Sequence, residues 1–168
     1  MNRLLLLRHA SAAFGAPGMA DIDRPLSERG LKEAAALGDR LRDEGLLPDN
    51  ILCSTARRAR QTLQALGEPF STSLPVTWSE ELYRTDADGC RNLISAVDEK
   101  QTLMVIGHNP TLEDLLFESI ASAAPDVMAA AEARGLVQSA FAVLQFEGGY
   151  LPFANDTGKL VTFIAPEP

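Results

Sequence analysis

The chain has 168 residues, 46% of them hydrophobic and 23% charged, which is an ordinary balance for a soluble globular protein. Its formal net charge of −8 argues against a nucleic-acid-binding surface, and no apolar run approaches the ~20 residues of a membrane span. The two cysteines, Cys53 and Cys90, form neither a metal-type cluster nor a disulfide framework. We therefore expect a single cytoplasmic domain over residues 1–168, without a cleaved leader and without a nucleic-acid or membrane partner.

The first element is a short apolar run, which predicts a fully buried strand over residues 1–7. The run ends in Arg8 and His9, and the small and polar residues at 10–23 predict a loop. In open α/β sheets the ligand crevice lies at the carboxyl ends of the strands. We therefore expect Arg8 and His9 to lie at that crevice, beneath the loop.

The first helix is predicted to follow Ser27, which has the side chain of a helix N-cap, and to run to about residue 44 before Gly45 closes it. Its predicted apolar stripe consists of Leu31, Ala34, Ala35, Leu37, Gly38 and Leu41. Arg24 precedes Pro25, where extended backbone is favoured. The side chain of Arg24 is therefore expected to reach outward rather than to join the helix.

A second strand is predicted at 49–53, and Ser54 and Thr55 then open a second helix at the same edge of the sheet. Its first turn carries Arg57, Arg58 and Arg60, although the helix dipole disfavours cations there. At least one of these arginines is therefore interpreted as serving an anion. Arg57 and Arg60 are spaced to share one face and Arg58 points elsewhere, so a solvated basic face remains an alternative for Arg57 and Arg60.

The rest of the chain alternates strands and helices. The predicted elements are an edge strand at 76–78, helices at 90–98, 109–120 and 125–135, strands at 103–107, 140–146 and 160–164, and a hairpin-like turn at 148–158. This alternation predicts a three-layer α/β/α sandwich with a mostly parallel central sheet.

Only two histidines occur in the chain, and both His9 and His108 directly follow a predicted core strand. If those strands are neighbours, their axes lie ~4.8 Å apart and the two imidazoles face each other across one site. A neutral imidazole is a competent nucleophile, and guanidinium groups stabilise the charge of a phosphoryl group under attack. Because arginines supply that charge, no metal and no other cofactor is required, and two histidines without a carboxylate cluster are a poor metal site.

Four segments carry a resemblance to a known family: Leu7-Arg8-His9-Ala10, Asp23-Arg24-Pro25-Leu26-Ser27-Glu28-Arg29-Gly30, Ser54-Thr55-Ala56-Arg57-Arg58-Ala59-Arg60-Gln61-Thr62 and Val105-Ile106-Gly107-His108-Asn109-Pro110. Together, and in this order, they resemble the histidine phosphatase superfamily, whose fold is phosphoglycerate mutase-like. Within it they are most similar to the small SixA-type phosphohistidine phosphatases.

The resemblance implies that His9 is the nucleophile that becomes phosphorylated. Arg8, Arg58 and His108 would hold the phosphoryl oxygens, with Arg24 in support. Arg58 is chosen because the family's arginine directly precedes the alanine of its Arg-Ala pair.

Further site residues are less sharply indicated. Ser11 and Asn109 are further candidate phosphate contacts. Many members of the superfamily use a glutamate from the middle of the chain as general acid, for which Glu81, or failing it Glu80, is the candidate. A solvated helix start is the alternative reading of the same Glu-Glu-Leu-Tyr stretch.

The segment between Glu81 and Gly107 is short, so we expect no sizeable cap and an open crevice. An open crevice suits phosphohistidine on the surface of a protein, and the expected activity is hydrolysis through a covalent phosphohistidine intermediate. The alternatives are a small-molecule phosphomonoesterase, which depends more on a general acid, and a phosphate-binding module without turnover. A mutase is disfavoured because an uncapped site would lose its phosphoryl group to water.

Overall fold

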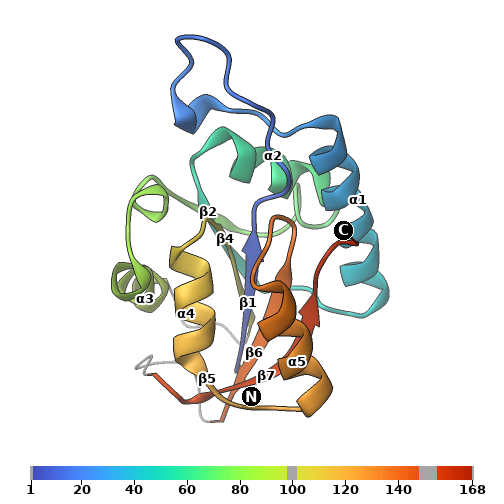
Figure 1. Cartoon of the computed structure of the whole chain (residues 1–168), viewed down its shortest axis with the longest axis vertical. Helices are drawn as coiled ribbons and strands as arrows, with labels where there is room; N and C mark the ends of the chain where they lie inside the picture. Colours follow the sequence, from blue (N-terminus) through green and yellow to red (C-terminus); the bar gives the residue numbers. More distant parts are fainter. Residues whose placement is uncertain (1, 98–101, 148–154, 168) are drawn as a thin grey trace.

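The structure is a computed structural model that describes residues 2–97, 102–147 and 155–167. The strands are β1 (Asn2–Arg8), β2 (Asn50–Ser54), β3 (Val76–Ser79), β4 (Thr102–Gly107), β5 (Ile120–Ala123), β6 (Phe141–Phe146) and β7 (Gly158–Ile164). The α-helices are α1 (Glu28–Asp43), α2 (Arg57–Ala65), α3 (Ala87–Ala96), α4 (Thr111–Ser119) and α5 (Pro125–Arg134), and two 3-10 helices span Asp21–Asp23 (η1) and Glu81–Tyr83 (η2). Figure 1 shows these helices packed around a central sheet.

The described strands form one seven-stranded sheet in the order β3-β2-β4-β1-β6-β7-β5. β1 pairs in parallel with β4, β4 with β2, and β2 with β3, whereas β6 runs antiparallel to both of its neighbours. The prediction of a mostly parallel sheet is thus confirmed. Because parallel strands end at the same edge, the carboxyl ends of β1, β2 and β4 lie together.

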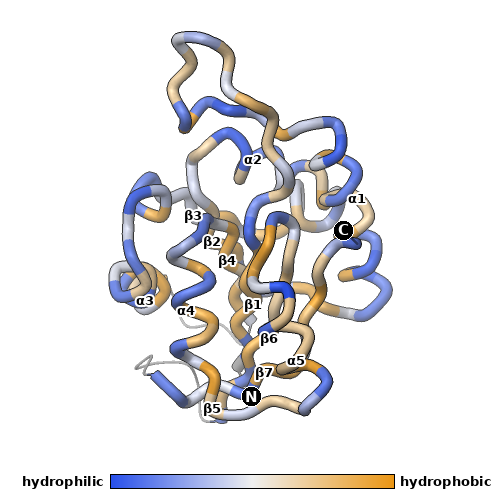
Figure 2. The backbone as a smooth tube through the Cα atoms, in the orientation of Figure 1, coloured by the Kyte–Doolittle hydropathy of each residue, from blue (hydrophilic) through white to orange (hydrophobic). Residues whose placement is uncertain are grey.

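The leucines of β1 alternate between the two faces of the sheet, as the two-residue period of a strand requires. Leu4 and Leu6 pack in the cluster that includes side chains of α3, α4 and α5, and Leu5 and Leu7 pack in the cluster with α1 and α2. All four are completely buried. Figure 2 shows the apolar strands in the interior and many hydrophilic residues along α1, α3 and α4 around them. The three-layer α/β/α prediction is therefore confirmed.

The first helix begins and ends where the sequence predicts, but its buried face differs. The Ser27 side chain accepts a hydrogen bond from the Gly30 amide, and Gly45 adopts the positive φ of 66° that closes the helix. Leu31 is 44% exposed and Ala35 is also exposed, so their place in the predicted stripe is wrong. Gly30 is buried instead, because the start of the helix packs directly against the backbone that follows β1.

Other differences are local. β5 was not predicted: residues 120–123 were assigned to a helix end and a loop, because alanine and serine have weak strand preferences and parallel pairing with β7 decides the conformation. The helix predicted at 90–98 begins earlier, at Ala87, with Asp86 as the cap that accepts a hydrogen bond from the Gly89 amide. Most of the hairpin-like turn predicted at 148–158 lies outside the described residues. None of the helices within the described ranges is both long and apolar enough to span a membrane.

Candidate active site

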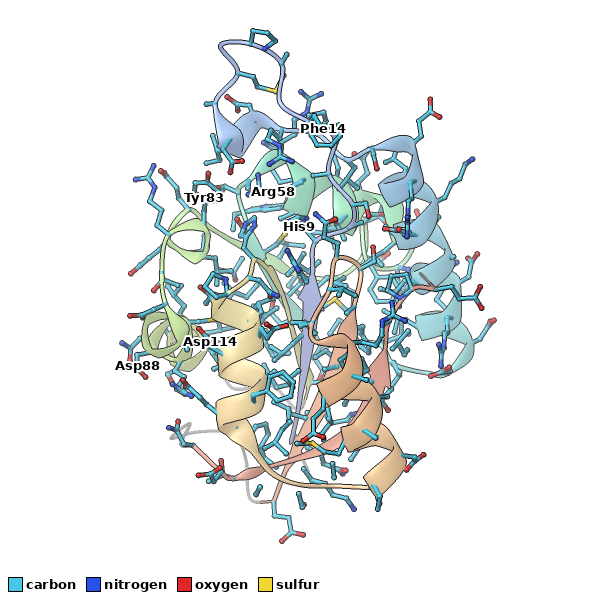
Figure 3. All side chains as sticks on the ribbon, viewed as in Figure 1. His9, Phe14, Arg58, Tyr83, Asp88 and Asp114 are labelled. Atoms are coloured by element: carbon cyan, nitrogen blue, oxygen red, sulfur yellow. The ribbon has the colours of Figure 1, made fainter. Side chains whose placement is uncertain are left out.

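The two histidines lie side by side at the carboxyl edge of the sheet. Arg8, the last residue of β1, is paired with Gly107, the last residue of β4, in the parallel register. His9 follows Arg8 and His108 follows Gly107, so the two histidines leave neighbouring strands at the same level. The ring centroids of the two imidazoles are 5.1 Å apart, and the residues are only 5% and 8% exposed. The structure therefore brings both imidazoles to one site, as the spacing of the sequence predicts. In Figure 3, His9 lies with Arg58 and Tyr83 at the end of β1.

Hydrogen bonds fix both nitrogens of the His9 ring. Nδ1 lies 2.8 Å from the carbonyl oxygen of Ala10, and Arg58 Nε donates to Nε2 over 3.1 Å. Because a carbonyl oxygen only accepts, Nδ1 carries the proton of the neutral ring and Nε2 presents its lone pair. Burial, with Arg58 and Arg8 next among the cations, lowers the pKa of His9 to about 4. His9 is therefore neutral at physiological pH, with an unprotonated nitrogen facing Arg58.

Thr62 of α2 couples the end of β1 to the helix that carries Arg58. The Ala10 amide donates to Thr62 Oγ1 over 3.0 Å, and the same hydroxyl donates to the Arg58 carbonyl oxygen over 2.7 Å. Thr62 is completely buried, so its single hydroxyl makes these two bonds away from water. This contact sets the position of the segment after β1, which carries His9, relative to Arg58.

His108 is held from the neighbouring strand β2. Its Nε2 lies 2.8 Å from the hydroxyl of Ser54, and its Nδ1 is buried without a hydrogen-bond partner in the described part of the chain. The Tyr83 ring meets the imidazole edge-on at 5.4 Å. Burial and then the neighbouring His9 and Arg58 lower the pKa of His108 to about 3. The second imidazole is thus also neutral, and one of its nitrogens has no hydrogen-bond partner among the described residues.

Three guanidinium groups surround His9, and each of them lowers its pKa. Arg58 is buried and donates from Nη1 and Nη2 to the carbonyl and carboxylate oxygens of Asp21, over 2.7 and 3.1 Å. Arg8 donates from Nη1 to the Leu136 carbonyl, whereas its buried Nε has no partner among the residues described. Arg24 contributes to the lowered pKa of His9 only through its charge. The hydrogen bonds of the Arg24 guanidinium go to the Ala13 carbonyl and to Asp21.

Asp21 and Tyr83 belong to the site although sequence reasoning missed both. The Asp21 carboxylate pairs with Arg24 at 3.0 Å and with Arg58 at 3.1 Å, and it accepts a hydrogen bond from the Tyr83 hydroxyl over 2.7 Å. These contacts, with the Tyr83 hydrogen bond as the largest cause, lower the pKa of Asp21 to about 2. Arg58 also lies over the Tyr83 ring, 5.5 Å from its centroid. A fixed negative charge thus orients the two arginines at the rim of the site.

Residues 4–129 match the histidine phosphatase superfamily (branch 1). The chain belongs to this superfamily. A solved structure named as a phosphohistidine phosphatase, SixA, from Agrobacterium tumefaciens is 38% identical, with a TM-score of 0.82 over 98% of both chains. A SixA structure from Nakamurella multipartitia is 34% identical, also with a TM-score of 0.82, over 99% of this chain and 97% of that one. A protein of Mycobacterium tuberculosis strain H37Rv without a known function is 35% identical over 95% of this chain and 99% of its own.

The side chains of Ser11 and Asn109 form hydrogen bonds with groups other than the two imidazoles. The Ser11 hydroxyl donates to Glu33 Oε2 over 2.8 Å, and its amide is bonded to the same oxygen. The Asn109 amide donates to the Leu136 carbonyl over 2.9 Å, while its Oδ1 is buried and unpartnered within the described ranges. A role for Ser11 and Asn109 in phosphate binding stays a prediction, with Ser11 the less favoured of the two.

The two glutamates considered as general acid are not brought to the imidazoles. Glu81 is exposed, and no hydrogen bond or ion pair joins its carboxylate to the described residues. Glu80 is exposed as well and pairs with Arg84 at 3.2 Å. The acid role of Glu81 therefore stays a prediction that no contact in the structure supports.

The charges and donors of this site suit a tetrahedral anion. Arg8 Nε and His108 Nδ1 are buried polar nitrogens without partners among the residues described, and both residues lie close to the His9 ring, whose Nε2 presents a lone pair. Guanidinium groups bind phosphoryl oxygens in a bidentate geometry. Within the same described residues, no group of three or more His, Cys, Asp or Glu side chains is placed to hold a metal ion.

Proposed function

We propose that this chain is a phosphatase that removes a phosphoryl group from phosphohistidine on a protein, through a covalent intermediate on His9. The observation that carries the proposal is the neutral His9 ring, whose Nε2 lone pair faces Arg58 while Nδ1–H is fixed on a carbonyl oxygen. The likeness to the SixA structures of two bacteria supports phosphohistidine as the substrate. We also propose that residues 1–168 act as one domain without a cap over the site.

In the first step, His9 Nε2 attacks the phosphorus atom, a P–Nε2 bond forms and the P–N bond to the substrate imidazole breaks. The phosphoryl oxygens bind Arg8, Arg58 and His108, and Arg58 Nε must leave the Nε2 lone pair before the new bond forms. Loss of one such donor costs about 3 kcal/mol of transition-state stabilisation in comparable sites. The hydrogen bond from Nδ1–H to the Ala10 carbonyl stabilises the positive charge that the ring gains when it is phosphorylated.

In the second step, the oxygen of a water molecule attacks phosphorus and the P–Nε2 bond breaks. The products are inorganic phosphate and a neutral His9 that again presents its lone pair. The water proton leaves with the phosphate or passes to solvent, so the cycle consumes one water and no other reagent.

The leaving group decides between phosphohistidine and an alkyl phosphate ester. The nitrogen of a leaving imidazole is basic enough to take its proton from solvent, whereas an alkoxide needs a placed general acid. Neither Glu80 nor Glu81 contacts the imidazoles, which favours the phosphoramidate substrate. A role for Glu81 as acid is proposed only for ester substrates.

The test uses a protein chemically phosphorylated on histidine with labelled phosphate. The wild-type chain is expected to release the label as inorganic phosphate, and His9→Ala is expected to lose that activity. Arg40→Ala, an exposed substitution at the far end of α1, is the matched control and should retain it. Activity retained by His9→Ala would refute the assignment.

A second measurement separates turnover from binding. Quenching the wild-type reaction early should trap labelled phosphate on His9, stable to alkali and labile to acid. Binding of phosphate without a trapped label and without turnover would instead identify a phosphate-binding module.

A further inference from the structure

A polar cavity of about 360 Å³ lies beside the catalytic site. Its walls come from the two elements that also build that site: Arg57 and Arg60 of α2, and Asp23 of η1. Arg58 lies between these two arginines in sequence but turns inward to His9. Arg58 bonds Asp21 of η1, the element that also carries Asp23 of the cavity lining, so the cavity and the catalytic pocket are built from the same two elements.

Arg57 and Arg60 have no acidic partner among the residues that the structure describes. Both are exposed, and neither forms an ion pair within the described part of the chain, whereas Arg24, Arg40 and Arg58 all do. They belong to the first turns of α2, where the helix dipole disfavours cations. Asp23 is the one carboxylate of the cavity lining, so the lining keeps a net positive charge. On a chain with net charge −8, such a patch is complementary to an acidic partner.

Two exposed aromatic side chains are found close by, one in the loop after β1 and one against Arg60. Phe14 is 99% exposed in the loop after β1, and Figure 3 shows it at the end of the molecule that holds His9 and Arg58. Trp78 is 48% exposed, and Arg60 lies over its ring at 5.9 Å from the centroid. Aromatic residues and arginines are the side chains enriched where proteins bind one another. A small phosphorylated molecule in the catalytic pocket would leave a fully exposed phenylalanine uncovered, whereas a protein surface covers it.

We infer that the docking rim, defined as Phe14, Arg57, Arg60 and Trp78, binds an acidic protein surface that surrounds the phosphohistidine of the substrate. The inference rests on the proposed phosphohistidine phosphatase activity and names its partner. Carboxylates of the partner pair with Arg57 and Arg60, an apolar contact covers Phe14, and the phosphorylated imidazole reaches His9 between them. Specificity for the protein thus comes from side chains outside the catalytic pocket.

The test compares kcat/KM on two substrates for single variants of the rim. One substrate is a histidine-phosphorylated protein with acidic residues around the histidine, and the other is phosphoimidazole, which carries the same P–N bond without a protein. Arg57→Glu and Arg60→Glu should each lower kcat/KM for the protein about tenfold, mainly through KM, and Phe14→Ala by a similar factor. Activity on phosphoimidazole should stay at the wild-type level, which also verifies that the variants fold.

Arg40→Glu is the matched control, because it makes the same change of charge on an exposed turn near the end of α1 opposite Ser27. It should leave both activities unchanged. Raising the salt concentration should weaken the wild-type activity on the protein, and the charge-reversed variants should respond less.

Three results would overturn the inference. Rim variants that act on the protein as well as the wild type does would show that the rim does not recognise the partner. A loss confined to a small diphosphorylated ester would assign Arg57 and Arg60 to a second phosphate of a metabolite. A wild-type chain that hydrolyses phosphoimidazole but no phosphohistidine protein would fail already at the proposed function, before any variant is compared.

Discussion

Acidification is the perturbation that tests the electrostatics of the site most directly. Burial is the largest cause that lowers the pKa of both imidazoles, to about 4 for His9 and about 3 for His108, and the surrounding arginines add to it. An unperturbed histidine titrates near pH ~6.5. We therefore expect His9 to remain a neutral nucleophile at pH 5, where it would be about 90% unprotonated and an unperturbed imidazole only about 3%.

The lowered pKa of His9 also makes the free energy of unfolding depend on pH. The pKa of His9 is lower in the folded chain than in the unfolded chain, so the unfolded chain binds more protons below pH ~6.5. The contribution of His9 is therefore fully present above pH ~6.5 and is lost as the pH falls towards about 4. A change from 6.5 to about 4 corresponds to about 3 kcal/mol, which should be subtracted from the free energy of unfolding across that window.

Nuclear magnetic resonance measures the pKa of each imidazole without ambiguity, because the sequence contains only two histidines. The imidazole resonances of a labelled sample are followed from pH 7.5 downwards, and His108→Asn leaves only His9 to assign. In parallel, kcat/KM on phosphoimidazole, corrected for ionisation of the substrate, should stay level to pH 5 and fall tenfold per unit only below about pH 4.

An imidazole midpoint at pH 6 or above for His9 in the folded chain would refute the reasoning, since it would mean that burial and three guanidinium groups leave the ring unperturbed. A second check is the Arg58→Gln variant, which removes a positive charge that lowers the pKa of His9. The His9 midpoint should move upward in this variant. No movement would show that the charge of Arg58 does not reach the ring.

The remaining predictions concern single substitutions. Gly30→Ala should lower the free energy of unfolding in urea by about 1–3 kcal/mol, because its Cβ would lie 2.1 Å from a backbone oxygen of the segment after β1. Gly15→Ala, whose Cβ would meet only side-chain carbons at 3.6 Å, should be neutral, and equal effects of the two would contradict this. Asp21→Asn should tighten competitive inhibition by inorganic phosphate about threefold or more, because it removes a carboxylate that occupies two guanidinium groups; weaker inhibition would contradict the expectation. Glu81→Gln should leave hydrolysis of phosphoimidazole within about twofold of wild type, and a large loss would restore Glu81 as an acid for this substrate.

The buried strands could be predicted because their apolar runs are continuous and end abruptly in polar residues. β1 and β4 are such runs, and each is followed by one of the two histidines. Parallel pairing then places both imidazoles at one edge, so the centre of the site followed from the sequence. β5 has no such run, and only its pairing with β7 makes it a strand.

The rim of the site could not be predicted in the same way, because loop contacts have no period. Asp21 and Tyr83 are separated by 62 residues and meet through one hydrogen bond between two short 3-10 helices. The sequence analysis gives Ser11 as a candidate phosphate contact. In the structure Glu33 holds its hydroxyl instead, a contact between the loop and α1 that sequence spacing does not encode.

The directions of the three arginines of α2 follow partly from the sequence pattern and partly from the packing of the helix. Their place in the first turns of a helix is unfavourable, and the pattern correctly indicated that Arg58 differs in direction from Arg57 and Arg60. The inward direction of Arg58 is set by its neighbour one turn on, because Thr62 accepts from the Ala10 amide and so anchors this face of the helix beneath His9. The remaining two arginines are then forced outward. In the two proposals made above, one helix therefore supplies a cation for the reacting phosphoryl group and two more for the protein that carries it.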